Sequence, residues 1–184
     1  ADGGEALLQT HRREVVVTFL DMRGFTAFTD RAEPEEVMSV LAQYYDVMGK
    51  LVLAHEGTLQ RFEGDGMTIF FNDPIELANP AANAVRMALA MRDQFVTLQA
   101  AWKKLAFDLA LGIGIAQGYA TLGAVGFEQR WEYTCIGAVT NRAARLCSEA
   151  KGGQVLVDQK TLASVEASVE AAPLGEFYLK GIVA

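Results

Sequence analysis

The stretch that decides the fold is VVVTFLDMRGFT, residues 15–26. It opens with apolar, β-branched residues, a composition typical of a buried strand. Asp21 comes as this apolar run ends, and Gly24 then marks a turn before a short helix expected over Ala27–Arg31. A carboxylate at a strand end, beside the N–H groups of a helix start, can hold a divalent cation and a polyphosphate together. Asp21 can equally be a simple helix cap, and this stretch alone does not decide between the two interpretations.

The composition is that of one globular domain. The chain has 184 residues, of which 51% are hydrophobic and 21% are charged, and this balance argues against disorder. The formal net charge is −7 and there is no run rich in lysine or arginine, so we expect neither nucleic acid nor an anionic membrane surface as a partner of this domain. A nucleotide substrate remains compatible with this charge, because metal ions offset phosphate charge locally.

The chain has the features of a cytoplasmic domain. No segment approaches the ~18 consecutive apolar residues of a membrane span, and the start has no signal-peptide pattern. Cys135 and Cys147 lie in a strand pattern and a helical pattern, and we expect both to be reduced core residues. We interpret residues 1–13 as a linker from an upstream regulatory domain. Residues 14–184 would then be a domain excised from a longer protein, whose membrane attachment the sequence leaves open.

Local patterns predict a helix and a hairpin after the first turn. Apolar residues recur at helical spacing over Pro34–Ala54, with acidic residues in the first turn. Two strands, Thr58–Phe62 and Met67–Phe71, flank Glu63–Gly66, and an Asp-Gly pair between apolar strands indicates a tight hairpin. Asp65 is therefore open to two interpretations, as a residue that the turn requires or as a functional carboxylate.

The rest of the chain completes a βααββαβ order with further elements behind it. Gly118 is expected to turn one strand into the next, and the order places helices over a mostly antiparallel sheet. The predicted fold class is therefore α+β, a ferredoxin-like sandwich with additional C-terminal strands and helix. The remaining expected elements are a helix over 77–103, strands over 107–116 and 118–123, a strand over 131–136, a helix over 139–150, a strand over 154–157, a short helix over 159–165 and a last strand over 176–179.

In that topology the first strand lies beside the central hairpin, so Asp21 can face Asp65. Two carboxylates that lie close together repel each other unless a cation lies between them, which indicates a site for Mg²⁺ or Mn²⁺. The absence of histidine or cysteine partners excludes zinc. Two such ions per site suit phosphoryl chemistry, in which one ion activates the attacking oxygen and the other binds the triphosphate.

Three motifs and one lysine together resemble a known family. The motifs are Phe19–Thr26, Arg61–Met67 and Tyr133–Leu146, followed by Lys180. In this order they are similar to the catalytic domain of class III adenylyl and guanylyl cyclases, and in particular to the bacterial type of adenylyl cyclase. The resemblance extends over nearly the whole chain, residues 14–181. It implies a homodimer with composite active sites, each built from both subunits.

The resemblance implies that one subunit supplies the metal-binding half of each site. Asp21 and Asp65 match the metal-binding aspartates of the family, and the backbone carbonyl of Met22 is a further expected ligand. The turn Gly24-Phe25-Thr26 is expected to hold the outer phosphates of the substrate. The implied cofactor is Mg²⁺ or Mn²⁺, with two ions in each site.

The other subunit would supply the groups that act on the ribose and the phosphates. Asn141 matches the asparagine that orients the ribose, Arg145 the arginine that stabilises charge at the α-phosphate, and Lys180 the lysine that binds the outer phosphates. These residue types suit the chemistry, because attack of the ribose 3′-oxygen on the α-phosphorus builds negative charge on the phosphoryl oxygens and on the departing pyrophosphate. Asn141 and Arg145 are spaced to project from one face of the predicted helix.

Arg61 and Thr134 stand where the family recognises the base. Arg61 replaces the usual lysine and can donate to N1 of adenine, and the Thr134 hydroxyl can accept from N6. Guanylyl cyclases have glutamate and cysteine at these positions, but here Glu63 is two positions off and Cys135 is out of register. The expected reaction is therefore ATP to 3′,5′-cyclic AMP and pyrophosphate. Guanylyl cyclase activity, and a degenerate module that binds nucleotide or only dimerises and relays a signal, remain as alternatives.

Overall fold

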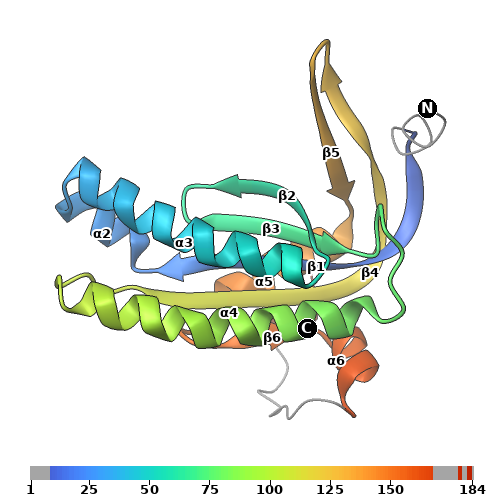
Figure 1. Cartoon of the computed structure of the whole chain (residues 1–184). Helices are drawn as coiled ribbons and strands as arrows, with labels where there is room; N and C mark the ends of the chain where they lie inside the picture. Colours follow the sequence, from blue (N-terminus) through green and yellow to red (C-terminus); the bar gives the residue numbers. More distant parts are fainter. Residues whose placement is uncertain (1–8, 168–177, 180–181, 184) are drawn as a thin grey trace.

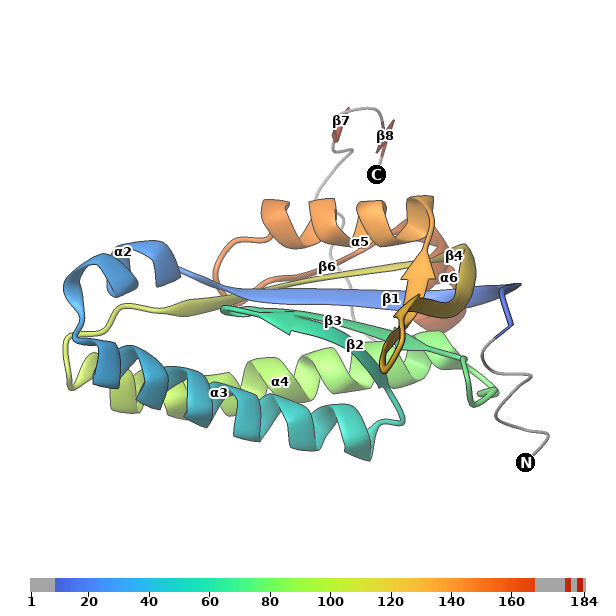
Figure 2. The ribbon, with the colours of Figure 1, turned by 90° about the horizontal axis from the view of Figure 1, so that it is seen from above.

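A mostly antiparallel sheet with helices on both faces forms the body of the molecule (Figure 2). The computed structural model describes residues 9–167, 178–179 and 182–183. The strand order is β2-β3-β1-β4-β5, and β6 pairs in parallel with β4, whereas the other pairs in this sheet are antiparallel. Helices α3 and α4 cover one face, and α5 covers the other (Figure 2). The predicted α+β sandwich is confirmed.

The elements follow the predicted order, and strand β8 is added at the end. It pairs with β7, and the expected strand over 176–179 is described only at residues 178–179. The bounds are β1 His11–Arg23, α2 Phe25–Arg31, α3 Pro34–Ala54, β2 Thr58–Glu63, β3 Gly66–Phe71, α4 Pro80–Lys103, β4 Ala110–Phe127, β5 Arg130–Ile136, α5 Ala138–Glu149, β6 Val155–Val157, α6 Gln159–Val165, β7 Tyr178–Leu179 and β8 Ile182–Val183.

Strand β1 runs through the middle of the sheet and carries apolar side chains on both faces. Val16 and Leu20 belong to the core under α3 and α4, whereas Val15 and Val17 belong to the core under α5. Because side chains alternate between the two faces of a strand, a strand covered on both faces needs an unbroken apolar run. The apolar run at the start of residues 15–26 is therefore explained by the position of β1 in the middle of the sheet, between the two cores.

Strand β1 begins at His11 rather than at Val15, so residues 11–13 belong to the sheet and not to a linker. His11 pairs with Leu122 of β4 at the start of an uninterrupted ladder. The early start escapes prediction because these first residues are polar, and Arg12 is exposed. The linker interpretation is therefore restricted to residues before His11.

Strand β4 is continuous from Ala110 to Phe127, where the sequence predicts a turn at Gly118. Gly118 pairs with Val15 of β1 within the ladder. A Cβ atom at this glycine would lie 3.3 Å from the Cβ of Val139 and 3.1 Å from a guanidinium nitrogen of Arg142, both on α5. The glycine therefore permits α5 to approach the sheet closely, and the predicted turn is wrong.

Helix α4 begins at Pro80, later than the expected start at residue 77. The Asn79 side chain accepts a hydrogen bond from the Ala82 N–H at 3.1 Å and so caps the helix, and proline is common in the first helical position. Among the described residues, no helix is both long enough and apolar enough to cross a membrane.

A buried carboxylate joins the start of β1 to strand β5. The Asp73 side chain is 1% exposed, and its Oδ2 atom lies 2.6 Å from Nε2 of His11 and 3.6 Å from Nε of Arg13. The Tyr133 hydroxyl, from β5, donates to the other carboxylate oxygen of Asp73. His11 thus has a structural partner, although its sequence context predicts only solvation.

We expect this cluster to make the stability of the fold depend on pH. The pKa of His11 is raised above 6.5, first by its hydrogen bond to the Gln9 carbonyl and then by Asp73. Because the fold favours the protonated ring, the stabilisation is fully present below pH 6.5 and is lost as the pH rises through the folded pKa. The difference in unfolding free energy between the wild-type chain and His11→Gln, measured in urea between about pH 5.5 and 8.5, should shrink with rising pH by up to about 1 kcal/mol. A difference that stays constant with pH would contradict this.

Candidate active site

Asp21 and Asp65 meet where strand β1 ends. Leu20 of β1 pairs with Met67 of β3, which places the β2–β3 turn that contains Asp65 beside the end of β1. The Oδ2 atom of Asp65 accepts a hydrogen bond from the Met22 N–H at 2.9 Å. The structure thus brings together, in one chain, the three residues predicted to bind metal.

The Asp21 carboxyl group lies among opposing charges. Burial raises its pKa, the neighbouring Arg23 guanidinium lowers it, and the negative charge of Asp65 raises it again. The Oδ1 atom of Asp21 is buried without a hydrogen-bond partner and forms an ion pair with Nη2 of Arg23 at 2.6 Å. Two carboxylates held close together in a partly buried setting attract a further cation.

The donor set at this strand end fits a magnesium or manganese ion. Asp21 and Asp65 supply carboxylate oxygens and Met22 supplies a backbone carbonyl, and all of these are hard ligands. Mg²⁺ is commonly held by one or two carboxylates and completes its shell with water and substrate phosphates. In the described part of the chain, no group of three or more His, Cys, Asp or Glu side chains could hold a metal.

Helix α3 supports the turn that carries Asp65. The Tyr45 hydroxyl donates to the carbonyl of Gly64, and its ring lies 5.0 Å from the ring of Phe62. Tyr44 instead points into the core, where its hydroxyl is buried without a hydrogen-bond partner. Helical spacing assigns both tyrosines to core packing, so the contact between Tyr45 and the turn has no signal in the sequence.

Tyr45→Phe should weaken metal binding while leaving the fold intact. Loss of the hydrogen bond to Gly64 costs about 1 kcal/mol of unfolding free energy and lets the Asp65 turn move. Mn²⁺ affinity, measured by electron paramagnetic resonance without nucleotide, should fall about three- to tenfold. Tyr119→Phe is the matched control, because this exposed tyrosine of β4 pairs with Glu14, near the other end of β1 from Asp21, and loss of its hydroxyl should leave the affinity unchanged. Equal Mn²⁺ affinities in the two variants would contradict a supporting role for Tyr45.

Gly24 has a backbone conformation that few other residues adopt. Its φ angle is +85°, in the left-handed region, and a Cβ atom there would lie 2.7 Å from the carbonyl oxygen of Asp108. Helix α2 starts at the next residue, so the N–H groups of Phe25 and Thr26 belong to its first turn. The predicted phosphate-binding turn therefore has a fixed shape and directly follows the strand end with the two aspartates.

The segments that carry Arg61 and Thr134 come together, although β2 and β5 stand at opposite ends of the strand order. The Gln60 side chain of β2 accepts a hydrogen bond from the Cys135 N–H of β5 at 3.2 Å. Arg61 lies 3.9 Å from a carboxylate oxygen of Glu132, two positions before Thr134. Cys135 is 2% exposed and Thr134 is half-buried, so the two point to different faces of β5, as their register predicts.

Helix α5 carries the residues predicted to act on ribose and phosphate. Asn141 is exposed in its first half and Arg145 is half-buried one turn later. The carboxyl end of α5 lies beside the aspartates that are predicted to bind metal, because Arg23 contacts Asp21 and donates to the carbonyls of Cys147 and Ser148. Asn141 is about 9 Å from Cys147 along the helix axis. A single chain therefore places the end of α5, and not its start, beside Asp21. Lys180 lies outside the described residues.

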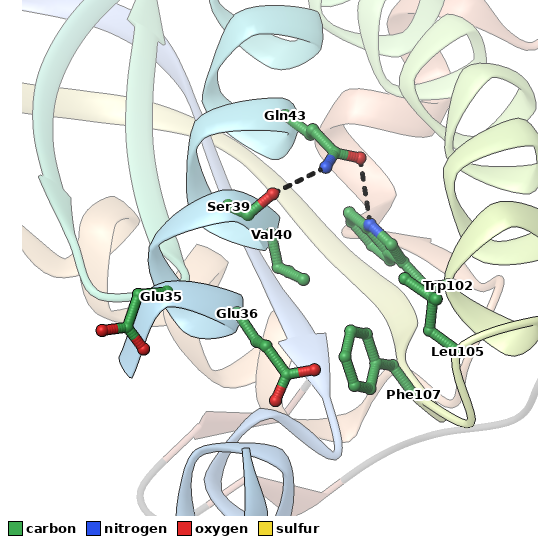
Figure 3. A pocket seen from close by; sticks show the side chains of 8 residues that line it. All are labelled: Glu35, Glu36, Ser39, Val40, Gln43, Trp102, Leu105 and Phe107. Atoms are coloured by element: carbon green, nitrogen blue, oxygen red, sulfur yellow. Dashed lines mark hydrogen bonds between the residues drawn. The ribbon is translucent and has the colours of Figure 1, made fainter. Parts of the chain in front are cut away.

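A separate groove opens between the start of α3 and the end of α4, on the face away from α5 (Figure 3). Its volume is about 220 Å³, and the Gln43 amide bridges Ser39 and the Trp102 indole at one side. None of the predicted site residues lines it. The lining residues are Glu35, Glu36, Ser39, Val40, Gln43, Trp102, Leu105 and Phe107.

Comparison with known proteins gives these residues a family context. The family model for the adenylate and guanylate cyclase catalytic domain matches residues 8–183. The chain belongs to this family. The cyclase domain is 33% identical to adenylate cyclase 1 of Rhizobium meliloti over 92% of this chain and 26% of that relative. The chain thus spans about a quarter of the length of that relative.

Solved cyclase structures have the same fold. The adenylyl cyclase CyaB from P. aeruginosa matches with a TM-score of 0.91 and 33% identity, over 95% of this chain and 91% of that chain. The guanylyl cyclase Cya2 matches with a TM-score of 0.89 and 31% identity, over 94% of this chain and 88% of that chain. The cyclase domain therefore belongs to a family of purine-nucleotide cyclases. Because similar structures include both an adenylyl and a guanylyl cyclase, its preference for adenine or guanine has to be inferred from its own residues.

Two site residues are missed by sequence reasoning. Arg23 lies within residues 15–26, and its sequence context predicts no role for it, although a cation two positions from Asp21 on a strand shares its face. That spacing is a usable signal. Tyr45 approaches the Asp65 turn from another element, and its spacing on α3 is that of an ordinary core residue.

Proposed function

We propose that this cyclase domain converts ATP to 3′,5′-cyclic AMP and pyrophosphate at two sites shared between two copies of the chain. Its likeness to adenylate cyclase 1 and to the adenylyl cyclase CyaB supports the reaction class. Its likeness to the guanylyl cyclase Cya2 leaves the base open. The observation that carries the choice of ATP is the hydrogen bond of the Thr134 hydroxyl.

The Thr134 hydroxyl donates to the carbonyl of Gly123 at 3.1 Å. Because a hydroxyl has one hydrogen, this bond leaves its oxygen able only to accept. The N6 group of adenine is a donor, whereas O6 of guanine is an acceptor, so Thr134 in this state suits adenine. Arg61, whose side chain is 58% exposed, remains accessible to donate to N1.

Thr134→Val should reduce the preference for ATP over GTP. Valine keeps the shape of the side chain but cannot accept from N6, so kcat/KM for ATP should fall about tenfold while the value for GTP stays the same. Thr121→Val, an exposed position on the neighbouring strand β4, is the matched control and should change neither value. An equal fall for both nucleotides would show that Thr134 does not select the base.

The metal-binding half of each site would come from one copy. Asp21, Asp65 and the Met22 carbonyl would hold two Mg²⁺ or Mn²⁺ ions, which when bound activate the ribose hydroxyl and neutralise triphosphate charge. The chain's own part is to fix these oxygens, since the Met22 N–H holds Asp65 and Arg23 holds Asp21. The Gly24-Phe25-Thr26 turn would offer N–H groups to the outer phosphates.

The second copy would supply Asn141, Arg145 and Lys180. Within one chain the end of α5, rather than the Asn141 region, lies beside the aspartates, which supports a site completed by another copy. Asn141 would orient the ribose so that its 3′-oxygen points at the α-phosphorus. The Arg145 guanidinium would stabilise charge on the α-phosphate, and Lys180 would bind the outer phosphates.

The β4–β5 arm supports assembly into a homodimer. It projects from the body of the molecule (Figure 1), and Val125, Phe127 and Trp131 on it are 57%, 68% and 60% exposed. Large apolar side chains gathered on a projecting arm mark an interaction surface. Two-fold pairing would give two identical sites. An upstream regulatory domain in the full-length protein is part of this proposal, because the chain covers only 26% of adenylate cyclase 1.

A cyclase assay on the purified domain tests the proposal. Cyclic AMP and pyrophosphate should form from ATP in equal amounts with Mg²⁺ or Mn²⁺, and GTP should be a poorer substrate. Specific activity should rise with protein concentration until the dimer is saturated. Cyclic GMP as the main product would replace the proposal with a guanylyl cyclase. No cyclic product from either nucleotide, at concentrations where the dimer is demonstrated, would leave a degenerate signalling module.

A further inference from the structure

Arg23 connects two parts of the chain that the proposed function assigns to different active sites. Its Nη2 atom lies 2.6 Å from Oδ1 of Asp21 and donates to the Cys147 carbonyl at 2.5 Å. Its Nη1 atom donates to the Ser148 carbonyl at 3.4 Å. One planar guanidinium therefore contacts a predicted metal ligand at the end of β1 and the carboxyl end of α5 at the same time.

Strand β4 is shaped to hold this guanidinium. Gly112 pairs with Asp21 across the β1–β4 ladder. A Cβ atom at Gly112 would lie 2.4 Å from Nη2 and 2.6 Å from Nε of Arg23, so the arginine lies flat against a position without a side chain. The Arg23 side chain is only 29% exposed, and its Nε atom is buried. The Arg23 contacts are therefore held in place by the packing of β4, unlike an ion pair between two exposed side chains.

Both partners of Arg23 call for its particular chemistry. The last carbonyls of a helix carry partial negative charge and lack partners within the helix, so a cation there is favourable. A guanidinium offers several N–H donors in a fixed plane, whereas a lysine ammonium is a single point of charge. Arg23 can therefore bond Asp21, Cys147 and Ser148 together, and lysine cannot reproduce all three contacts.

We propose that Arg23 is a positioning residue that ties Asp21 to the carboxyl end of α5 and, in the homodimer, connects the two composite active sites. This rests on the proposed function, in which Asp21 serves one site while Asn141 and Arg145 of the same α5 serve the other. A shift of Asp21 in one site then moves the α5 groups of the second site through Arg23. The connection is internal to each chain and needs no change of the dimer interface.

The first experiment needs no cyclase activity. Mn²⁺ binding without nucleotide is measured by electron paramagnetic resonance, and amide hydrogen exchange is measured over residues 145–150. In Arg23→Ala, Mn²⁺ should bind about three- to tenfold more tightly, because a cation beside Asp21 is removed. The end of α5 should exchange about tenfold faster, because its carbonyl anchor is lost. A variant that had only lost its fold would bind Mn²⁺ more weakly.

Two further variants separate the contacts that Arg23 makes from the effect of its charge and from a general loosening of α5. Gly112→Ala should displace the guanidinium from both partners without removing its charge, and it should also speed exchange at the end of α5. Arg142→Ala is the matched control on the same helix, because Arg142 anchors α5 through Asp158 and the Gln117 carbonyl. Its Mn²⁺ affinity, corrected for the folded fraction, should be unchanged. Unchanged Mn²⁺ affinity or unchanged α5 exchange in Arg23→Ala would overturn the proposal.

The second experiment asks whether Arg23 acts on both sites. In a mixture of Asp65→Ala and Asn141→Ala chains, one site of the mixed dimer is complete, with its aspartates from the Asn141→Ala chain and its α5 groups from the other. Arg23→Ala is then added to either chain. Activity of the complete site should fall about ten- to a hundredfold in both cases, and Arg23→Lys should restore only part of it. A fall confined to one chain, or to neither, would overturn the link between sites. If the mixture with intact Arg23 shows no recovery, the proposal of an active site shared between two copies is wrong. The Mn²⁺ and hydrogen-exchange measurements still decide whether Arg23 ties Asp21 to α5.

Discussion

A mixture of Asp65→Ala and Asn141→Ala chains is expected to recover about a quarter of the wild-type cyclase activity, although each variant alone is inactive. Each homodimer lacks one essential group in both of its sites, so cyclic AMP formation should fall by at least about 10³-fold. Random pairing makes about half of the dimers mixed, and a mixed dimer has one complete site of two. Half of the dimers with half of their sites gives the expected quarter.

A second mixture, of Asp21→Ala with Asp65→Ala, is the matched control. Both carboxylates belong to the same half-site, so every site of a mixed dimer lacks one of them. No activity should return, although subunit exchange is the same. Both mixtures are assayed for cyclic AMP after exchange has been demonstrated with differently tagged chains. Recovery in the control, or none in the first mixture, would contradict sites shared between two copies.

The fold was within reach of the sequence because its strongest signals are local. The apolar run over Val15–Leu20 indicates a central strand, and the Asp-Gly pair at Asp65 indicates a hairpin. The alternation of helices and strands then leaves few arrangements. Once β1 lies beside β3, the approach of Asp21 to Asp65 follows from strand pairing alone. These parts of the site were predictable for the same reason as the fold.

Other features depend on contacts that leave no local trace. Gly118 has the sequence appearance of a turn, yet it is glycine because α5 packs against it. His11 precedes the apolar run and is polar, yet its partner is the buried Asp73 in a loop far along the chain. A glycine that a turn requires and a glycine that lets a helix pack closely are the same residue type. The sequence alone therefore does not distinguish these two reasons for glycine.

The same distinction separates the predicted site residues from the missed ones. Asp21 was predicted as a site residue because it stands at a strand end within a motif. The role of Arg23 depends on its hydrogen bonds to the carbonyls of Cys147 and Ser148, which lie near it only because α5 packs on the sheet. The role of Tyr45 likewise depends on its hydrogen bond to the Gly64 carbonyl, which belongs to another element. Supporting residues of this kind require a structure.

Arg145→Ala and Arg142→Ala, two arginine substitutions on helix α5, should have opposite consequences. Arg145→Ala should lower kcat about 10²- to 10³-fold with little change in KM for ATP, because its guanidinium is expected to act on charge that develops only in the transition state. Mn²⁺ affinity should stay close to the wild-type value, and the unfolding midpoint should fall much less than in Arg142→Ala. Arg145→Lys should regain part of the rate, because it restores the charge but not the planar set of donors.

Arg142→Ala should instead damage the fold. Its Nε atom lies 2.9 Å from Oδ2 of Asp158, whose side chain is 7% exposed, and its Nη2 atom donates to the Gln117 carbonyl. Removing one partner of such a buried pair costs about 3–5 kcal/mol of unfolding free energy, because the other charge is left buried. Residual kcat, corrected for the folded fraction, should stay within about threefold of wild type. If Arg145→Ala lost stability rather than rate, the two arginines would have the same structural role and α5 would carry no group that acts on the phosphate.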